Sequence, residues 1–279
     1  MQPLRDMEIG AMFWGGRDPI ETLRELKALG VRCGQIGIPG DMKLEGAAAA
    51  WRAALEAEQF TLVTVFGAFV GESYADIPTV QRTVGFIPRA TRAEREARTL
   101  AISDFAAEVG TPSIALHVGF VPEDPADPDY VAVRDMVRRV ADYAASRGQN
   151  FALETGQEPA HVLLAFLKGV DRPNVRINFD PANMILYGTG DPIEALGVLG
   201  SYVISLHCKD GDWPPKDVPG ALGAERPLGQ GSVGIERFIA KLKEIGYRGT
   251  LNIEREVENQ QERLRDIRMA VGLLERLRG

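Results

Sequence analysis

The chain has 279 residues, of which 45% are hydrophobic and 25% are charged. These fractions are ordinary for a globular protein, so they exclude intrinsic disorder, collagen-like repeats and disulfide-rich scaffolds. The 32 Lys and Arg residues and 39 Asp and Glu residues give a net charge of -7. That balance disfavours nucleic acid as the main partner, because phosphate binding favours a basic face.

The sequence shows no sign of secretion, membrane insertion or a structural zinc site. The segment 1–16 lacks the basic start and apolar core of a signal peptide. No apolar run approaches the ~18 residues that a membrane-spanning helix needs. Cys33 and Cys208 lie far apart and match no zinc spacing. We therefore expect a cytoplasmic protein that has neither a membrane nor a nucleic acid as its partner.

Short apolar runs, typical of buried strands, alternate with longer amphipathic stretches along the chain. In chain order, the expected elements are strand Glu8–Trp14, helix Asp18–Leu29, strand Cys33–Ile38, helix Lys43–Gln59, strand Thr61–Phe69, helix Thr91–Val109, strand Ser113–Val118, helix Asp127–Arg147, strand Asn150–Thr155, helix Glu158–Gly169, strand Val175–Asp180, helix Asp191–Leu199, strand Val203–Lys209, helix Gly234–Ile245, strand Thr250–Glu254 and helix Glu258–Leu277. Asp18 is expected to cap the first helix, with Pro19 in its first turn and Gly30 after its end.

This alternation predicts a parallel sheet, because each strand is followed by a helical crossover. Eight such units favour a single closed (β/α)8 barrel, the TIM barrel, over a six-strand doubly wound sheet that would leave two units unexplained. No linker divides the chain, so we expect residues 1–279 to form one barrel domain. The polar segments Gly71–Pro88 and Gly211–Gly231 are expected to be loops on the face where barrel enzymes carry their active sites.

Five of the expected strands carry a polar or charged residue at the end of an apolar run. These residues are His117, Glu154, Asp180, His207 and Glu254. Because the carboxyl ends of parallel barrel strands share one rim, the five side chains should converge although they lie far apart in sequence. Buried carboxylates without a cation would repel each other and would be costly to desolvate.

A divalent cation resolves this conflict. Glu154, Asp180, Glu254 and His207 together offer three carboxylates and one imidazole, a set of oxygen donors with one nitrogen. Such a set suits Mn²⁺, which we favour, and leaves Mg²⁺, Co²⁺ and Zn²⁺ open. We therefore expect one divalent metal ion, with room beside the four protein ligands for two substrate oxygens.

Five segments of the chain resemble the xylose-isomerase-like barrel superfamily. They are LETGQE at 153–158, NFDPANM at 178–184, SLHCKDGDW at 205–213, PLGQGSVG at 227–234 and LNIERE at 251–256. The likeness is strongest to proteins labelled sugar phosphate isomerase/epimerase, including ketose 3-epimerases, and it extends from Glu8 to Leu277. It implies the same four metal ligands.

The resemblance implies a metal-dependent isomerase or epimerase of a small keto sugar or related polyol. In the epimerases of this group two glutamates also transfer protons, which implies catalytic roles for Glu154 and Glu254 on opposite sides of the bound sugar. One glutamate would remove a proton to give an enediolate, and the other would return a proton on the opposite face. Related proteins often assemble as dimers or tetramers, so a homodimer or homotetramer is expected.

Two candidates for substrate binding come from the same resemblance. Asn183 stands where family epimerases often carry a histidine that touches a substrate oxygen, and Arg226 lies near an arginine that contacts the substrate's terminal oxygens. Neither residue needs a role in binding: Asn183 could simply occupy a turn, and Arg226 could be a solvated surface residue.

Four further residues could contact the substrate. His117 could also orient a metal ligand, and Lys209 could position a loop or a substrate hydroxyl. Trp14 and Phe66 could form walls of the pocket, since sugars stack on aromatic rings. A structural histidine, a surface lysine and ordinary aromatic packing remain open for these positions.

Three other functions also remain open. A lyase would remove the same proton and then expel a leaving group, as related barrels do with inosose or dehydroshikimate. An enzyme of the endonuclease IV kind would use three metals and more histidines than the three of this chain, and Asn183 stands where another histidine ligand would be expected. A non-enzymatic sugar-binding barrel would not need Glu154 and Glu254 intact.

Overall fold

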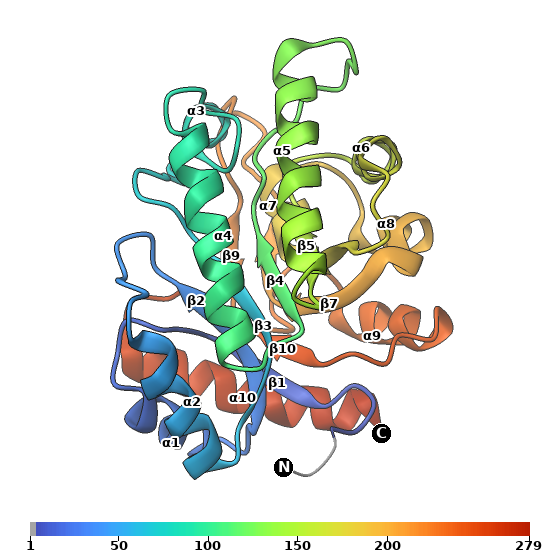
Figure 1. Cartoon of the computed structure of the whole chain (residues 1–279). Helices are drawn as coiled ribbons and strands as arrows, with labels where there is room; N and C mark the ends of the chain where they lie inside the picture. The colour runs from blue at the N-terminus through green and yellow to red at the C-terminus, as the bar shows by residue number, and fades with distance from the viewer. Residues whose placement is uncertain (1–3) are drawn as a thin grey trace.

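A computed structural model describes residues 4–279 and shows eight parallel strands closed into a barrel (Figure 1). Around the barrel, the strands are β1 (Ile9–Trp14), β2 (Cys33–Ile38), β3 (Thr61–Gly67), β4 (Ser113–Leu116), β5 (Asn150–Glu154), β6 (Val175–Phe179), β7 (Val203–Cys208) and β10 (Leu251–Ile253), which pairs back with β1. Each barrel strand pairs with the next barrel strand along the chain, so the predicted TIM barrel is confirmed.

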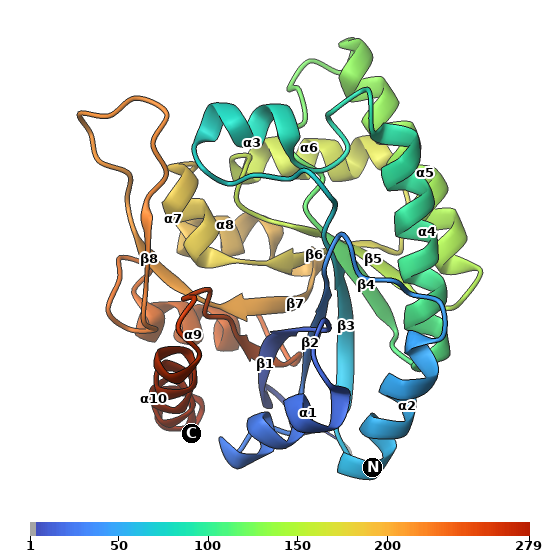
Figure 2. The ribbon, with the colours of Figure 1, turned by 90° about the vertical axis from the view of Figure 1, so that its left-hand side faces the viewer.

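Most helices lie outside the barrel and cover its strands, as Figure 1 and Figure 2 show from two sides. The helices are α1 (Pro19–Ala28), α2 (Ala47–Glu58), α3 (Ile77–Thr83), α4 (Arg92–Glu108), α5 (Pro128–Ala145), α6 (Ala160–Val170), α7 (Pro181–Tyr187), α8 (Pro192–Leu199), α9 (Ile235–Glu244) and α10 (Gln260–Arg278). The Asp18 carboxylate accepts a hydrogen bond from the N–H of Glu21, as expected of the residue that caps α1. Within residues 4–279, none of the helices combines the length and the apolar character needed to cross a bilayer.

Four short elements depart from the sequence prediction. The helix α3 lies inside the segment 71–88. Of two antiparallel strands, β8 (Asp210–Asp212) overlaps the start of the second expected loop, Gly211–Gly231, and β9 (Ala224–Arg226) lies within it. The helix α7 follows β6 directly. The two helices have seven residues each and the two strands have three, so they are too short to show a hydrophobic period. The two strands also depend on pairing between residues that are distant in sequence.

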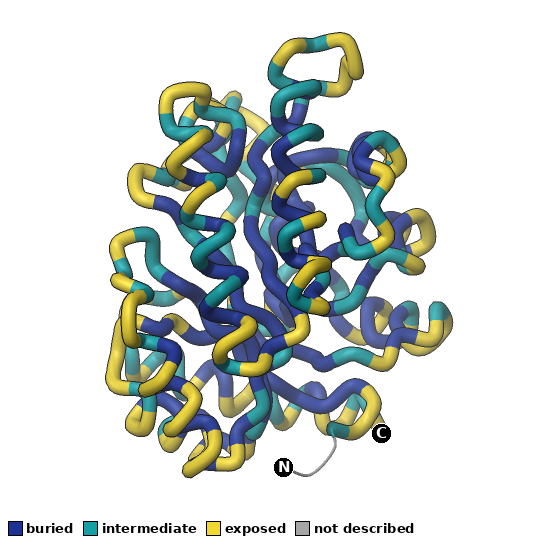
Figure 3. The backbone as a smooth tube through the Cα atoms, viewed as in Figure 1, coloured by how far each residue is buried: buried dark blue, intermediate teal, exposed yellow. Residues whose placement is uncertain are grey.

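Two apolar layers stabilise the barrel. The larger layer lies between strands and helices, where the rings of Phe179 and Phe238 stack with centroids 6.0 Å apart. The smaller layer includes Met12, Phe66 and Ala152 from the barrel strands. In Figure 3 the buried positions follow the strands, while exposed positions gather on the outer helices and turns. Both faces of the sheet are therefore covered, as a parallel sheet requires.

The segment 71–88 is fixed by a carboxylate and a guanidinium. Glu72 accepts hydrogen bonds from the N–H groups of Phe69 and Gly85, at 2.9 and 2.8 Å. The buried Arg95 of α4 donates to the carbonyl of Gly85. Gly85 has a φ of +67°, and a side chain there would contact the backbone carbonyl of Val118. This segment is therefore an ordered part of the barrel mouth.

Replacing Gly85 tests this close approach. We expect Gly85→Ala to lower the free energy of unfolding by about 2–4 kcal/mol, because alanine would adopt a left-handed conformation and also clash with Val118. The control is Gly71→Ala, where φ is +84° but the added methyl group meets open space, so a loss of about 1 kcal/mol is expected. Equal losses in urea denaturation would contradict the predicted contact.

Candidate metal centre

Four side chains from four strand ends meet at one end of the barrel. Glu154 ends β5, Asp180 follows β6, His207 lies in β7 and Glu254 follows β10. One donor atom of each lies within 4.8 Å of the others. The Nδ1 atom of His207 is 3.0 Å from Glu154 Oε1, 3.0 Å from Glu254 Oε2 and 3.6 Å from Asp180 Oδ2. The structure thus brings together the four residues expected to hold a metal.

Strand register explains why these residues share one rim. Glu154 lies beside Asn178 in the β5–β6 pair, and His207 lies beside Asn252 in the β7–β10 pair. Alternate residues of a strand face the same side of the sheet. Glu254 comes two residues after Asn252, so its side chain continues the inward-facing row.

Asp180 links the metal centre to a helix. Its Oδ1 atom accepts a hydrogen bond from the N–H of Asn183 at 3.0 Å and so caps α7. Thr155 binds the backbone of Asp180 on both sides, because its hydroxyl oxygen accepts from the N–H and its hydroxyl donates to the carbonyl. Oδ1 of Asp180 therefore caps the helix, and Oδ2 remains able to bind a metal in the cluster.

Three buried carboxylate oxygens of the cluster lack a hydrogen bond. Within residues 4–279, no donor reaches Glu154 Oε2, Asp180 Oδ2 or Glu254 Oε2 with hydrogen-bond geometry. Buried polar atoms are almost always paired, and buried charge needs compensation. Hard oxygen donors with one imidazole are a suitable set for a divalent cation. The residues present therefore fit one such ion.

A polar network lies behind His207. Its Nε2 atom is 3.2 Å from Gln35 Oε1 and 3.2 Å from Asn178 Nδ2. Gln35 Nε2 donates to Asn178 Oδ1 at 2.9 Å, and the hydroxyl of Ser205 donates to the same oxygen at 2.5 Å. Donation from His207 Nε2 to Gln35 is the arrangement that leaves the Nδ1 lone pair facing the carboxylates, as metal binding requires.

Burial and mutual charge shift the protonation of the cluster. Burial raises the pKa of Glu154 to about 8, although His207 acts in the opposite direction. Burial would lower the pKa of His207, but the carboxylates of Glu254 and Glu154 raise it well above its usual value. Burial also opposes ionisation of Glu254, yet His207 and Lys209 hold its pKa below its usual range. Without a metal the cluster therefore retains protons at neutral pH.

Lys209 places a cation beside this cluster. Its Nζ atom is 2.9 Å from Glu256 Oε2, 3.3 Å from Glu254 Oε2 and 3.8 Å from Asp180 Oδ2. Burial would lower the pKa of Lys209, but Glu254 and Glu256 raise it well above its usual value. The side chain is therefore a buried ammonium group.

A cavity of about 310 Å³ lies over the metal centre. Five of the expected substrate-binding residues line it, namely Trp14, Phe66, His117, Asn183 and Lys209. The sixth, Arg226, does not line it, because its exposed guanidinium pairs with Asp212 at 2.6 Å.

Several residues around the cavity were not predicted from the sequence. Tyr74 lines it from the segment 71–88, and Glu225 lines it from β9. Tyr187 and Glu256 also line it; Tyr187 lies three residues after the segment 178–184, and Glu256 is the last residue of the segment 251–256. Gln35 is a polar residue inside an otherwise apolar strand, and this was the available signal for an inward-facing role.

Two of the expected residues approach Glu154 directly. Asn183 Nδ2 donates to Glu154 Oε1 at 3.2 Å, and His117 Nε2 lies 3.9 Å from Glu154 Oε2. Burial, together with the charge of Lys209, lowers the pKa of His117 to about 4, so this imidazole is neutral at pH 7. Gln157 Nε2 lies 3.1 Å from His117 Nδ1. Donation across this contact puts the imidazole proton on the Nε2 side that faces Glu154.

Comparison with known proteins shows the family and agrees with the barrel fold. A sequence model of the family described as xylose isomerase-like TIM barrel matches residues 23–277, and the chain belongs to this family. A solved structure of a xylose isomerase domain protein from Planctomyces limnophilus is 45% identical, covers 98% of both chains and has a TM-score of 0.93.

More distant structures share the fold. A D-psicose 3-epimerase solved in the presence of D-fructose is 17% identical, covers 97% of this chain and 99% of its own, and has a TM-score of 0.70. The probable 3-DHS dehydratase AsbF from Bacillus anthracis, involved in petrobactin synthesis, is 15% identical, covers 95% and 99%, and has a TM-score of 0.69. The uncharacterized protein MJ1311 of Methanocaldococcus jannaschii is 26% identical over 159 residues, 53% of this chain. The chain spans about half the length of this curated relative.

Substituting Asp180 tests metal binding without removing the helix cap. We expect Asp180→Asn to lose most of the bound divalent ion, because an amide is a poorer ligand, while asparagine still caps α7. Elemental mass spectrometry of purified protein should find about one ion per chain in the parent and much less in the variant. His161→Ala is the control, since this exposed histidine lies outside the cluster, and its metal content should not change. Equal metal content in parent and Asp180→Asn would contradict the ligand assignment.

Metal affinity should depend on pH in one direction. The raised pKa values of Glu154 and His207 mean that a metal must displace protons, so Mn²⁺ affinity should rise from pH 6 to pH 8 by up to about tenfold per unit for each proton released. Isothermal titration in buffers of different ionisation enthalpy would measure both the affinity and the protons released. A pH-independent affinity would show that the ion binds elsewhere.

Proposed function

We propose that this protein is a metal-dependent isomerase or epimerase that moves a proton on a small keto sugar or related polyol. The observation that carries the proposal is the convergence of two glutamates, Glu154 and Glu254, on one buried cluster beneath a cavity of sugar size. Two carboxylates at one substrate can remove a proton and return one.

The metal in this proposal is held by Glu154, Asp180, His207 and Glu254. Mn²⁺ is our first choice, with Mg²⁺, Co²⁺ and Zn²⁺ as alternatives, because the set contains three oxygen donors and one nitrogen. When bound, the ion supplies Lewis-acid polarisation of a substrate carbonyl.

The two glutamates reach the substrate from different parts of the rim. The strands β6 and β7 separate β5, which carries Glu154, from β10, which precedes Glu254. One carboxylate removes the proton from the carbon beside the carbonyl and leaves an enediolate. The other delivers a proton from the opposite side, which inverts that carbon. In the metal-free cluster the pKa of Glu154 is raised and that of Glu254 is lowered, so the two carboxyl groups stand in different electrostatic environments.

The cavity favours an uncharged polyhydroxylated substrate. Trp14 and Phe66 offer ring surfaces, while Asn183 and His117 offer hydrogen bonds to hydroxyl groups. Lys209 is already compensated by two carboxylates, and Arg226 would reach a substrate only after leaving Asp212. A phosphate group would therefore gain no free cation among the described lining residues.

A lyase is the second candidate. Removal of the same proton, followed by loss of a leaving group from the next carbon, would give a dehydratase on a keto sugar or an inosose-type substrate. The D-psicose 3-epimerase neighbour connects this fold with keto-sugar chemistry, and the probable dehydratase neighbour is the reason to keep a lyase. The mass of the product separates the two reactions.

Exchange of substrate hydrogen with solvent tests the proposal. In D₂O with Mn²⁺, a panel of unphosphorylated ketopentoses and ketohexoses should contain one sugar that gains deuterium beside its carbonyl. We expect Glu254→Gln to slow this exchange by about 10²–10⁴-fold, because glutamine cannot accept the proton and is also a poorer metal ligand. The matched control is Glu108→Gln, an exposed carboxylate on α4, which should exchange at the parent rate.

Mass spectrometry of the same samples distinguishes the outcomes. An isomerised sugar whose mass changes only by the gain of deuterium supports the proposal, and loss of water or alcohol supports the lyase. Exchange at the parent rate in Glu254→Gln, with the variant folded, would contradict the proton-transfer role.

A further inference from the structure

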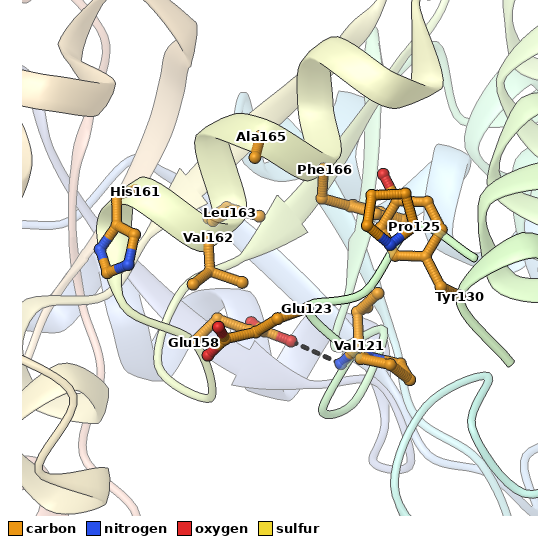
Figure 4. A pocket seen from close by; sticks show the side chains of 11 residues that line it. Val121, Glu123, Pro125, Tyr130, Glu158, His161, Val162, Leu163, Ala165 and Phe166 are labelled. Atoms are coloured by element: carbon orange, nitrogen blue, oxygen red, sulfur yellow. Dashed lines mark hydrogen bonds between the residues drawn. The ribbon is translucent and has the colours of Figure 1, made fainter. Parts of the chain in front are cut away.

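A second cavity lies beside the barrel, between the segment that follows β4 and the helix α6 (Figure 4). Its volume is about 210 Å³. The residues that line it are all different from those that line the cavity over the metal centre. It is therefore a separate space and not an extension of the barrel mouth.

The polar group of this cavity is the carboxylate of Glu158. The residue is 7% exposed, and its Oε1 atom accepts a hydrogen bond from the N–H of Val121 at 2.8 Å. In Figure 4 this bond joins the two sides of the cavity. Within residues 4–279, only the backbone N–H groups of Val121 and of Glu158 itself hydrogen-bond to this carboxylate, and no cationic side chain pairs with it. Burial raises the pKa of Glu158 to about 7, because the ionised carboxylate loses hydration in the cavity wall.

The walls of the cavity are apolar. Tyr130 of α5 and Phe166 of α6 meet edge to face, with ring centroids 5.5 Å apart, and Val162 completes this side. An apolar cavity of about 150 Å³ is large enough for benzene. The present cavity therefore accepts one ring or a short branched chain, with a few atoms more to reach Glu158.

The charged groups at the cavity limit the kind of ligand. Glu123 lines the exposed edge together with His161, and neither lysine nor arginine is among the described lining residues. An anion would be repelled by Glu158 and Glu123, and a neutral apolar molecule would leave the negative charge of the Glu158 carboxylate uncompensated. A primary ammonium group would provide the donors and the opposite charge, and the neighbouring aromatic rings also favour a cation.

We propose that this cavity is a second ligand site, which binds an organic primary ammonium ion with a small apolar body. The ammonium group would contact Glu158 Oε2, and the apolar body would lie against Tyr130, Phe166 and Val162. The site does not depend on the isomerase proposal, because it uses none of the metal ligands.

Binding of phenethylamine tests the site. At a pH of about 8 both Glu158 and the amine are largely charged. Isothermal titration should give saturable binding at about millimolar concentration, as suits a ligand of about nine heavy atoms. The matched neutral molecule, 2-phenylethanol, should bind at least about tenfold more weakly, because it cannot form the ion pair.

Variants locate the bound amine. Glu158→Gln keeps an oxygen that can accept from Val121 but removes the charge, so we expect phenethylamine affinity to fall by about tenfold. Glu123→Gln, at the exposed edge, should change affinity by less than about threefold. Glu254→Gln should bind the amine like the parent, because the metal centre is a different site.

Several results would overturn the proposal. They are the absence of saturable binding, equal affinity for phenethylamine and 2-phenylethanol, and unchanged affinity in a folded Glu158→Gln variant. Loss of binding in Glu254→Gln, with binding retained in Glu158→Gln, would show that the amine enters the barrel mouth instead. If thermal unfolding shows that Glu158→Gln is not folded, the comparison of phenethylamine with 2-phenylethanol on the parent protein still tests whether the site needs an ammonium group.

Discussion

The imidazole of His207 faces three carboxylates at the end of a closed barrel, and this concentration of charge in a buried place constrains the rest of the site. Such a group cannot exist without compensation, so it must hold protons, a metal or both. The polar network of Gln35, Asn178 and Ser205 behind the ring fixes its orientation from inside the barrel. The barrel interior is polar beside His207 because Gln35 and Asn178 lie within hydrogen-bond distance of its ring.

Some residues at the cluster serve the fold or balance charge in addition to, or instead of, offering a donor atom to a metal. Asp180 caps a helix with one carboxylate oxygen and offers the other to the cluster, so a single side chain joins the scaffold to the chemistry. Lys209 and Glu256 balance charge at the edge of the cluster without entering the set of four donors. Positions of this kind hold the donors in place before any ligand arrives, which is how a site avoids reorganisation during reaction.

The fold was predictable because strands and helices alternate with strong, regular patterns, and the barrel follows from their number. The cluster was predictable for a related reason, since Glu154, Asp180, His207 and Glu254 each interrupt an apolar run at a strand end. Gln35 was not recognised, because one polar residue within a short buried strand gives no period. Tyr74 and Glu225 were missed because their segments reach the cavity through tertiary contacts, including the short β8–β9 pair, which no local pattern encodes.

The walls of the main cavity come partly from two segments that contribute no donor to the metal cluster. Tyr74 belongs to the segment anchored by Glu72 and Arg95, and Glu225 belongs to the strand β9 that pairs with β8. Mutations in these segments can therefore alter the shape of the cavity while the strand ends that hold the cluster stay in place. Related barrels can therefore differ in substrate preference while they keep the same cluster of metal-binding side chains. The two segments are also suitable for exchange between homologous barrels in chimeric proteins.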